Sequence, residues 1–391
     1  SLNVVKKPLV DGGILTEQQL GIVGSALFFT YAVGKFTNGF IGDRVNITRF
    51  MAVGLLISSL VNIFLGLSNS FWVFVILWGI NGWVQSMGAP SCVVGLSRWF
   101  TDKERGSYYG FWSASHNIGE AITFIATAFI VSIAGWRYGF GAAGIAGLIG
   151  AAVILLFMKD SPTSQGLHSV MPLKEREKPA GKAQIEVLKN PYIWILALSS
   201  ACMYVSRYAI NSWGIFFLEN QKAYNSVEAS SIVAISAVCG IVGTVLSGFL
   251  SDKLFKSNRV VPAIIFGICN AIAIALFVLV PEGYYYIDIA SMLLFGLSIG
   301  VLICYLGGLM ATDIAPKKAS GAALGVVGIA SYLGAGLQDI MSGQLIGDSK
   351  TMVDGIVIYD FSSIQYFWIG AAALSVVFCA MLWRSNYKKV R

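Results

Sequence analysis

No Asp, Glu, Lys or Arg occurs from Phe50 through Ser97, a stretch of 48 residues. A membrane-spanning helix needs about 20 mainly apolar residues, so this stretch accommodates two of them. Five further uncharged stretches each exceed 20 residues, at 138–158, 229–251, 260–281, 289–312 and 361–383. The pattern therefore predicts an all-α membrane protein that crosses the bilayer many times.

The composition excludes other classes. Only 12% of the 391 residues are charged and 56% are hydrophobic, whereas soluble domains are about one quarter charged. The apolar runs lack the two-residue alternation and short strands of an outer-membrane barrel. The six cysteines lie in apolar runs without C-x-x-C spacing, and no nucleotide-binding loop is present. We therefore expect no enzyme, no metal site and no cofactor.

Loop signals from Gly, Pro and charged residues divide the chain into eleven predicted spans. These are residues 18–40, 50–68, 71–97, 107–134, 138–158, 190–218, 229–251, 260–281, 287–312, 319–346 and 363–383. The alternate loops that include the C-terminus contain 20 of the 27 Lys and Arg residues. The positive-inside rule places that side in the cytoplasm. The net charge of +7 thus has a topological origin and gives no reason to expect nucleic acid as a partner.

A polar segment divides the spans into two groups. Residues 159–189 are rich in Lys and Glu and read as a cytoplasmic linker, with a short amphipathic surface helix near 183–188. The predicted domains are an N-terminal transmembrane bundle over 1–158 with five full spans, and a C-terminal six-helix bundle over 190–391.

The two halves repeat. Gly39-Phe-Ile-Gly-Asp43-Arg44 in the first half matches Gly248-Phe-Leu-Ser-Asp252-Lys253, 209 residues later. We interpret the charged pairs of both motifs, Asp43 with Arg44 and Asp252 with Lys253, as conformational latches at the cytoplasmic helix ends. A parallel repeat with this motif resembles the major facilitator superfamily. That resemblance implies two six-helix bundles related by a pseudo-twofold axis. Residues 1–10 would then be the outer end of a first helix that is largely missing from this chain.

Ionisable side chains inside membrane spans cost about 2.5 to 3.5 kcal/mol each on insertion scales and usually have a function. The predicted spans contain five: Lys35, His116, Glu120, Arg207 and Asp339. Most of them belong to polar stripes of helical period. The stripes comprise Tyr31, Lys35 and Asn38; Ser113, His116, Asn117, Glu120 and Thr123; and Tyr204, Arg207, Tyr208 and Asn211. Polar stripes on several helices most simply line one aqueous cavity.

Three bases among tyrosines and amides favour an anion. Arginine offers a planar fork of donors that suits phosphate, and lysine adds a point charge. The second pKa of a phosphate monoester is near 6, in the range where His116 also titrates. The alternative for Arg207 is a structural ion pair with Asp339 or Glu120. Glu120 could also pair with Lys35 while the site is empty.

Several segments resemble the organophosphate:phosphate antiporters, which include glycerol-3-phosphate, hexose-6-phosphate and phosphoglycerate transporters. Arg105-Gly106, Trp112 and His116-Asn117-Ile118-Gly119 follow the signature of that family. The resemblance extends to YAVGKFTNGFIGDR at 31–44, NGWVQSMG at 81–88, MYVSRYAINSW at 203–213, SDKLFKSNR at 251–259 and APKKASGAALG at 315–325.

The resemblance implies a monomeric antiporter of the bacterial inner membrane that exchanges an organic phosphate for inorganic phosphate. The expected substrate-binding residues are Arg207, His116, Lys35, Tyr204, Tyr208, Asn117, Glu120 and Asn211. In the family, the arginine that corresponds to Arg207 acts with a partner arginine on the first helix. The repeat places that partner just upstream of Ser1.

The chain departs from the family at Ser113, where the family has Asn, at Glu120, where it has a second Gly, and at 89–91, which is often Trp-Pro-Pro. Two alternatives stay open. The family includes a membrane receptor that senses hexose phosphate, and Glu120 with Asp339 could instead serve a proton-coupled organic anion symporter.

Overall fold

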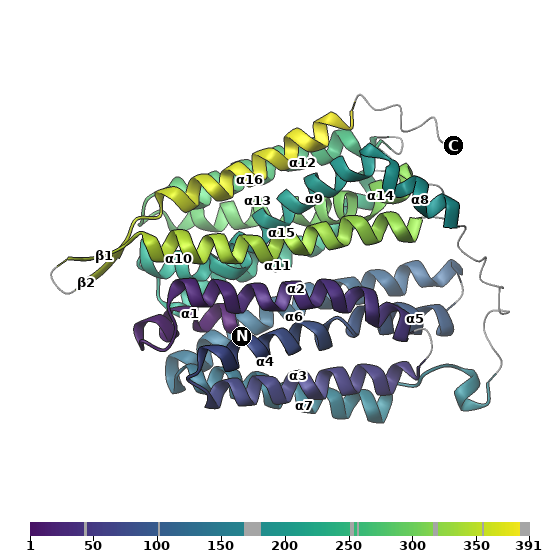
Figure 1. Cartoon of the computed structure of the whole chain (residues 1–391), viewed down its shortest axis with the longest axis horizontal. Helices are drawn as coiled ribbons and strands as arrows, with labels where there is room; N and C mark the ends of the chain where they lie inside the picture. Colours follow the sequence, from purple (N-terminus) through teal and green to yellow (C-terminus); the bar gives the residue numbers. More distant parts are fainter. Residues whose placement is uncertain are drawn as a thin grey trace.

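The structure, a computed structural model, describes residues 1–42, 45–100, 102–167, 181–250, 254–255, 258–315, 320–353 and 356–383. Within these residues the chain is almost entirely helical, with one β-hairpin. The helices lie nearly parallel to one another in an elongated body (Figure 1). Nine helical segments of the described part are long and apolar enough to cross a membrane, which makes this a multi-pass α-helical membrane protein.

The N-terminal half contains seven helices in the described part. They are α1 (Leu2–Asp11), α2 (Glu17–Gly42), α3 (Ile47–Leu67), α4 (Phe71–Gln85), α5 (Gly88–Trp99), α6 (Asp102–Ala134) and α7 (Trp136–Phe157). The predicted span 71–97 is therefore broken near Ser86 into α4 and α5. Residues 2–11 are helical, as the repeat predicts for the end of a first helix.

A 3₁₀ turn η1 (Thr163–Gln165) and a short helix α8 (Gly181–Lys189) precede the C-terminal half. That half contains α9 (Pro191–Tyr208), η2 (Ala209–Trp213), α10 (Gly214–Gln221), α11 (Ser226–Phe249), α12 (Val260–Leu279), α13 (Tyr285–Cys304), η4 (Tyr305–Leu309), α14 (Met310–Ile314), α15 (Ser320–Asp348), β1 (Lys350–Val353), β2 (Ile356–Tyr359) and α16 (Ser362–Met381). Two predicted spans are thus interrupted by π-helical turns, η2 and η4.

Local sequence explains several helix starts. The side chain of Asn46 accepts a hydrogen bond from the amide of Arg49 at 3.0 Å and caps α3. Asn190 caps α9 in the same way and is followed by a proline at the first helical position, where its missing N–H costs nothing. Asn225 and Glu228 form a complete capping box on α11. Asparagine side chains thus set where these spans begin.

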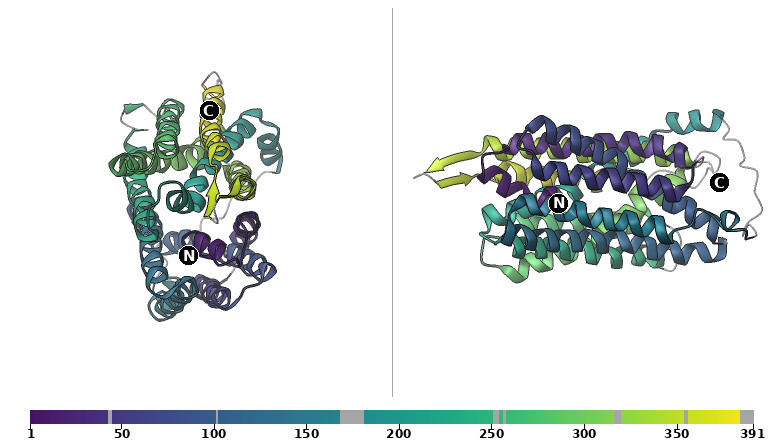
Figure 2. Two further views of the ribbon diagram at one scale, coloured as in Figure 1. Left: turned by 90° about the vertical axis from the view of Figure 1, so that its left-hand side faces the viewer. Right: turned by 90° about the horizontal axis from the view of Figure 1, so that it is seen from below.

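The helices gather in two groups, α1–α7 below and α9–α16 above in Figure 1, and the end-on view separates them in the same way (Figure 2). The groups meet along two helix pairs, α2 with α15 and α6 with α11. We call the end of the molecule that carries β1 and β2 the hairpin end. The opposite end, where α7 finishes and α8 begins, is the linker end.

Near the hairpin end, glycine residues allow α2 and α15 to approach each other closely. A Cβ atom on Gly21 would lie 2.5 Å from the carbonyl oxygen of Asp339, and one on Gly343 would lie 2.6 Å from the carbonyl oxygen of Glu17. Carbon atoms essentially never approach backbone oxygens so closely. Any side chain at these two positions would therefore push the halves apart.

A polar contact also joins the halves at the hairpin end. The buried Glu17 carboxylate, on α2, accepts hydrogen bonds from the Tyr359 hydroxyl at 2.5 Å and from the Lys350 ammonium at 2.9 Å. Burial and the bond to Glu17 raise the pKa of Tyr359 above its usual range. The hydroxyl therefore stays protonated at neutral pH and keeps donating, which ties the hairpin of one half to α2 of the other.

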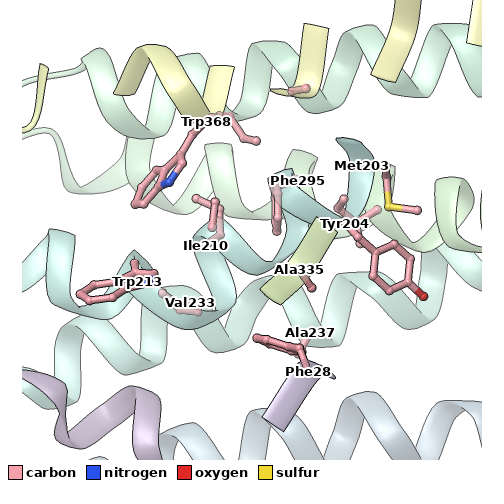
Figure 3. Packing of buried hydrophobic residues seen from close by; sticks show 14 of the residues in the cluster. Phe28, Met203, Tyr204, Ile210, Trp213, Val233, Ala237, Phe295, Ala335 and Trp368 are labelled. Carbon is pink, nitrogen blue, oxygen red and sulfur yellow. The ribbon is translucent and has the colours of Figure 1, made fainter. Parts of the chain in front are cut away.

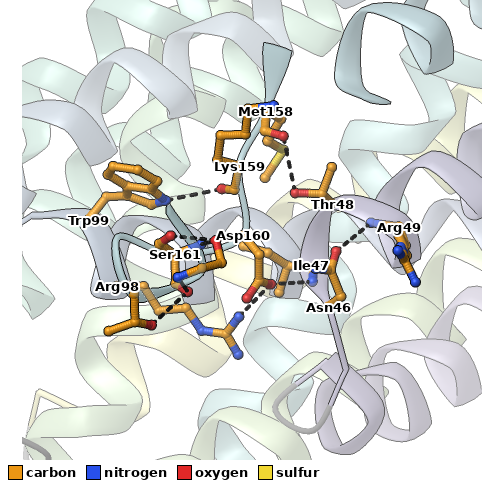
Figure 4. A network of polar contacts seen from close by, with 12 residues as sticks. Asn46, Ile47, Thr48, Arg49, Arg98, Trp99, Met158, Lys159, Asp160 and Ser161 are labelled. Atoms are coloured by element: carbon orange, nitrogen blue, oxygen red, sulfur yellow. Dashed lines mark hydrogen bonds and ion pairs between the residues drawn. The ribbon is translucent and has the colours of Figure 1, made fainter. Parts of the chain in front are cut away.

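At the linker end a second network fixes the chain as it leaves α7 (Figure 4). One carboxylate oxygen of Asp160 accepts from the amide of Ile47 at 2.8 Å and from Arg98 at 2.7 Å. The indole of Trp99 donates to the carbonyl of Lys159 at 3.1 Å. The start of the predicted linker is thus bound to α3 and α5 of its own half.

Candidate functional site

Arg207 lies one residue before the end of α9, near the middle of the membrane-crossing helical segment Pro191–Gln221. Its guanidinium carbon is 5.2 Å from the centre of the Tyr208 ring and 6.0 Å from that of Tyr204. The π-helical turn η2 begins two residues later at Ala209, and such turns are frequent at functional sites. The two tyrosines thus present their faces to a cation inside the membrane-spanning region.

Aromatic rings of α2, in the N-terminal half, pack against tyrosines of the C-terminal half and extend this aromatic group. Tyr31 on α2 packs on Tyr332 of α15 with ring centres 4.7 Å apart, and Tyr332 in turn lies 5.5 Å from Tyr204. Phe28, also on α2, meets Tyr208 edge-on at 4.5 Å. Figure 3 shows Phe28 approaching the C-terminal half beside Ala237, with Tyr204 nearby. Three helices from two halves therefore converge on Arg207.

Lys35 lies one helical turn beyond Tyr31 in the direction of the linker end. Its ammonium is 5.4 Å from the centre of the Tyr332 ring, and its side chain is exposed. It therefore reaches the same aromatic group as Arg207 from the opposite half. Asn38, in contrast, is fully buried and donates to Ser86 Oγ at 2.7 Å and to the carbonyl of Trp83 at 3.0 Å. The expectation that Asn38 lines a cavity is wrong, because Trp83 of α4 and Ser86, directly after α4, accept both of its donors.

The predicted residues of α6 lie on the face toward α11 and η2. His116 is exposed, and Asn117 and Glu120 are half-buried. A Cβ on Gly240 of α11 would be 3.4 Å from Asn117 Oδ1. Glu120 Oε1 accepts a hydrogen bond from Asn211 Nδ2 at 2.7 Å, and this bond crosses between the halves.

Among the described residues, Arg207 does not form the ion pair with Asp339 or Glu120 that the sequence left open as an alternative. Asp339 does not pair with Arg207, because Asp339 is fully buried nearer the hairpin end and lies 3.7 Å from the ammonium of Lys6. In the described part of the chain, Glu120 forms no ion pair with Arg207 or Lys35 and binds Asn211 instead. The contacts of Arg207 are thus with the rings of Tyr204 and Tyr208, and neither Asp339 nor Glu120 forms an ion pair with it.

Lys6 was not predicted, although it belongs to a second cluster between the halves. Its ammonium lies 3.5 Å from the centre of the Trp213 ring and makes no hydrogen bond. The Trp213 indole donates to Asp339 Oδ1 at 2.7 Å, and all three residues are at most 1% exposed. The repeat already placed residues 1–10 in a helix end, and applying the cost of buried charge to that segment would have indicated Lys6.

Some predicted features cannot be placed. The latch residues Asp43, Arg44, Asp252 and Lys253 and the side chain of Ser113 lie outside the described residues. No group of three or more His, Cys, Asp or Glu side chains suited to a metal occurs among the residues that the structure covers.

Comparison with known proteins decides the family. Residues 8–338 match the Major Facilitator Superfamily. The chain belongs to the Major Facilitator Superfamily. The bacterial homolog of the human lysosomal transporter Spinster, in an inward-facing and occupied conformation, shares the fold with a TM-score of 0.76 at 18% identity, over 99% of this chain and 93% of that one.

Relatives within the superfamily include a membrane sensor and transporters of phosphate esters. The membrane sensor protein UhpC of Salmonella typhimurium is 33% identical over 86% of this chain and 79% of its own length. A probable hexose phosphate transport protein of Chlamydia pneumoniae is 34% identical over 82% and 75%. The glycerol-3-phosphate transporter of Bacillus subtilis is 30% identical over 95% and 85%. These matches confirm the resemblance to the organophosphate:phosphate antiporter family, whose members are transporters and sensors and not enzymes.

Proposed function

We propose that this chain is a secondary active transporter that exchanges an organic phosphate ester for inorganic phosphate by alternating access. The ester is a sugar phosphate or glycerol 3-phosphate, the substrates named for its relatives. The observation that supports the proposal is Arg207, whose guanidinium lies over the ring of Tyr208 in the middle of a membrane-crossing segment, while Tyr208 in turn meets Phe28 of the opposite half. A planar fork of donors in such surroundings suits two oxygens of one phosphate group.

The other site residues take supporting roles in this proposal. Lys35 supplies a second positive charge from the opposite half, and His116 a group that titrates together with the phosphate. Tyr204 and Tyr208 orient the guanidinium and can donate to phosphate oxygens. The remaining predicted ligands, Asn117, Glu120 and Asn211, face the organic part of the ester.

Alternating access requires that the two halves separate at one end at a time. The contacts of Glu17 with the hairpin and the close approach at Gly21 and Gly343 support a state closed at the hairpin end. We place the hairpin end outside a bacterial cell and the linker end in its cytoplasm. The transporter would act as a monomer, with 1–158 and 190–391 rocking about the site.

Counterflow tests this proposal. The purified full-length protein, including any residues upstream of Ser1, is reconstituted into liposomes loaded with radiolabelled phosphate, and glucose 6-phosphate or glycerol 3-phosphate is added outside. We expect each effective ester to release the label in exchange, while buffer alone releases little. Absence of release by any ester, in protein that binds phosphate, would contradict exchange.

The similarity to the sensor UhpC favours a second candidate, a receptor that binds hexose phosphate without transporting it. The same liposomes separate the two, because a sensor binds the ester and shows little counterflow. Uptake that is driven by a pH gradient without internal phosphate would instead identify a proton-coupled symporter.

A further inference from the structure

The substrate site contains one acidic side chain among its bases. Glu120 extends from α6, one helical turn beyond His116, and is half-buried. The bond to Asn211, at 2.7 Å, engages one of its two carboxylate oxygens. Asn211 is itself 6% exposed and lies four residues after Arg207. Because residues four apart on a helix are neighbours on one face, Glu120 is held next to the turn that follows Arg207.

This placement brings an acid and a phosphate site together. An ester bound to Arg207 through its phosphate group would extend its organic part along the helix face that carries Asn211, whose side chain binds Glu120. The organic part of the ligand therefore meets the carboxylate.

A carboxylate distinguishes ligand groups by simple rules. It only accepts hydrogen bonds, so it binds hydroxyl groups, which donate. It repels a second carboxylate, and two like charges a few ångströms apart change affinity by between about fivefold in water and several hundredfold at the effective dielectric of a protein site. Asn211 holds the group in place, so the carboxylate cannot easily turn away from an acidic ligand.

We propose that Glu120 restricts the organic part of the substrate to an uncharged, hydroxyl-bearing group. The site would then accept hexose phosphates and glycerol 3-phosphate and reject esters that carry a carboxylate, such as phosphoglycerate. The charge balance agrees, because Glu120 offsets one of the two permanent cations, Arg207 and Lys35. This inference rests on the proposed function in that it takes Arg207 as the phosphate ligand.

The test compares two ligands that differ at one group. Glycerol 3-phosphate and 3-phosphoglycerate are alike except that one ends in a hydroxymethyl group and the other in a carboxylate. Their competition against labelled phosphate is measured by equilibrium binding to the purified full chain. We expect wild-type protein to prefer glycerol 3-phosphate by about tenfold or more. Equal affinities in the wild type would overturn the proposal, even if no Glu120 variant folds.

Variants then assign the preference to Glu120. In Glu120→Gln the preference should fall at least about tenfold, because the amide no longer repels the carboxylate. Glu120→Asp keeps the charge and should retain the preference. Glu282→Gln, the same change at an exposed loop residue, serves as the control. An unchanged preference in folded Glu120→Gln protein would show that Glu120 only joins the halves.

Binding also separates this proposal from the exchange mechanism. A protein that shows the preference but no counterflow would contradict the antiporter and leave the role of Glu120 intact. A protein that exchanges both esters equally well would contradict the role of Glu120 and leave the antiporter intact.

Discussion

At the scale of single residues, Arg207 is half-buried, lies over the rings of Tyr204 and Tyr208, and forms no ion pair with a carboxylate among the described residues. Its positive charge is stabilised by the faces of Tyr204 and Tyr208, which accept no directed pair of hydrogen bonds from the fork. The ring contacts offset only part of the free-energy cost of removing the guanidinium from water. An arriving anion therefore gains strong, charge-assisted hydrogen bonds.

Arg207→Lys should weaken phosphate binding about tenfold or more, because lysine keeps the charge but cannot form two parallel hydrogen bonds to one phosphate. The measurement is equilibrium binding of labelled phosphate to purified protein. Arg137→Lys is the matched control, since Arg137 bonds only to Gly66 and Asn69 away from the site in the described structure. Wild-type affinity in folded Arg207→Lys protein would refute the assignment.

Lys6 and Asp339 provide a second prediction at this scale. Removing one member of a buried ion pair leaves the other charge uncompensated and typically costs about 3 to 5 kcal/mol, whereas replacing both by neutral groups costs far less. Asp339→Asn alone should therefore lower the melting temperature in detergent. Lys6→Met combined with Asp339→Asn should recover most of the loss. If the two effects simply add, the pair contributes nothing to stability.

At the scale of helices, the contact between α2 and α15 depends on the absence of a side chain at Gly21. Gly21→Ala would place a methyl carbon 2.5 Å from the carbonyl of Asp339, so α2 must move away from α15 near the hairpin end. We expect lower thermal stability and slower phosphate exchange.

Gly370→Ala is the control for Gly21→Ala, because a Cβ on Gly370 of α16 would meet nothing within 4 Å. There the higher helix propensity of alanine should leave stability unchanged or raise it by about 1 kcal/mol at most. Equal behaviour of the two variants in thermal unfolding and exchange would show that the close approach at Gly21 is unimportant.

At the scale of the whole molecule, the contacts that join the two halves at the hairpin end must be broken before that end can open, and breaking them costs free energy. Glu17 with the hairpin, and Lys6 with Asp339, must part when that end opens. A bound anion compensates the bases between the halves, and an empty site does not. We therefore expect efflux of labelled phosphate to be at least about tenfold faster with unlabelled phosphate outside than with none. Equal efflux into phosphate-free buffer would indicate a uniporter.

The sequence alone determined the class, the bounds of most long helices to within a few residues, the family and the helices that carry polar stripes. These follow from local properties, since the bilayer demands about 20 apolar residues per span and charges inside a span are costly wherever the helix packs. The repeat also predicted that residues 2–11 are helical.

Only the tertiary structure decided which polar groups meet. Asn38 belongs to the same stripe as Lys35, yet packing against α4 removes it from the site. Asp339 pairs with Lys6, 333 residues away in sequence, and Tyr332 joins Tyr31 to Tyr204. Helical periodicity assigns a residue to a face of its own helix but carries no information about the neighbour of that face. That neighbour is set by the close approach of α2 to α15 and of α6 to α11, which depends on side-chain packing between segments far apart in the chain.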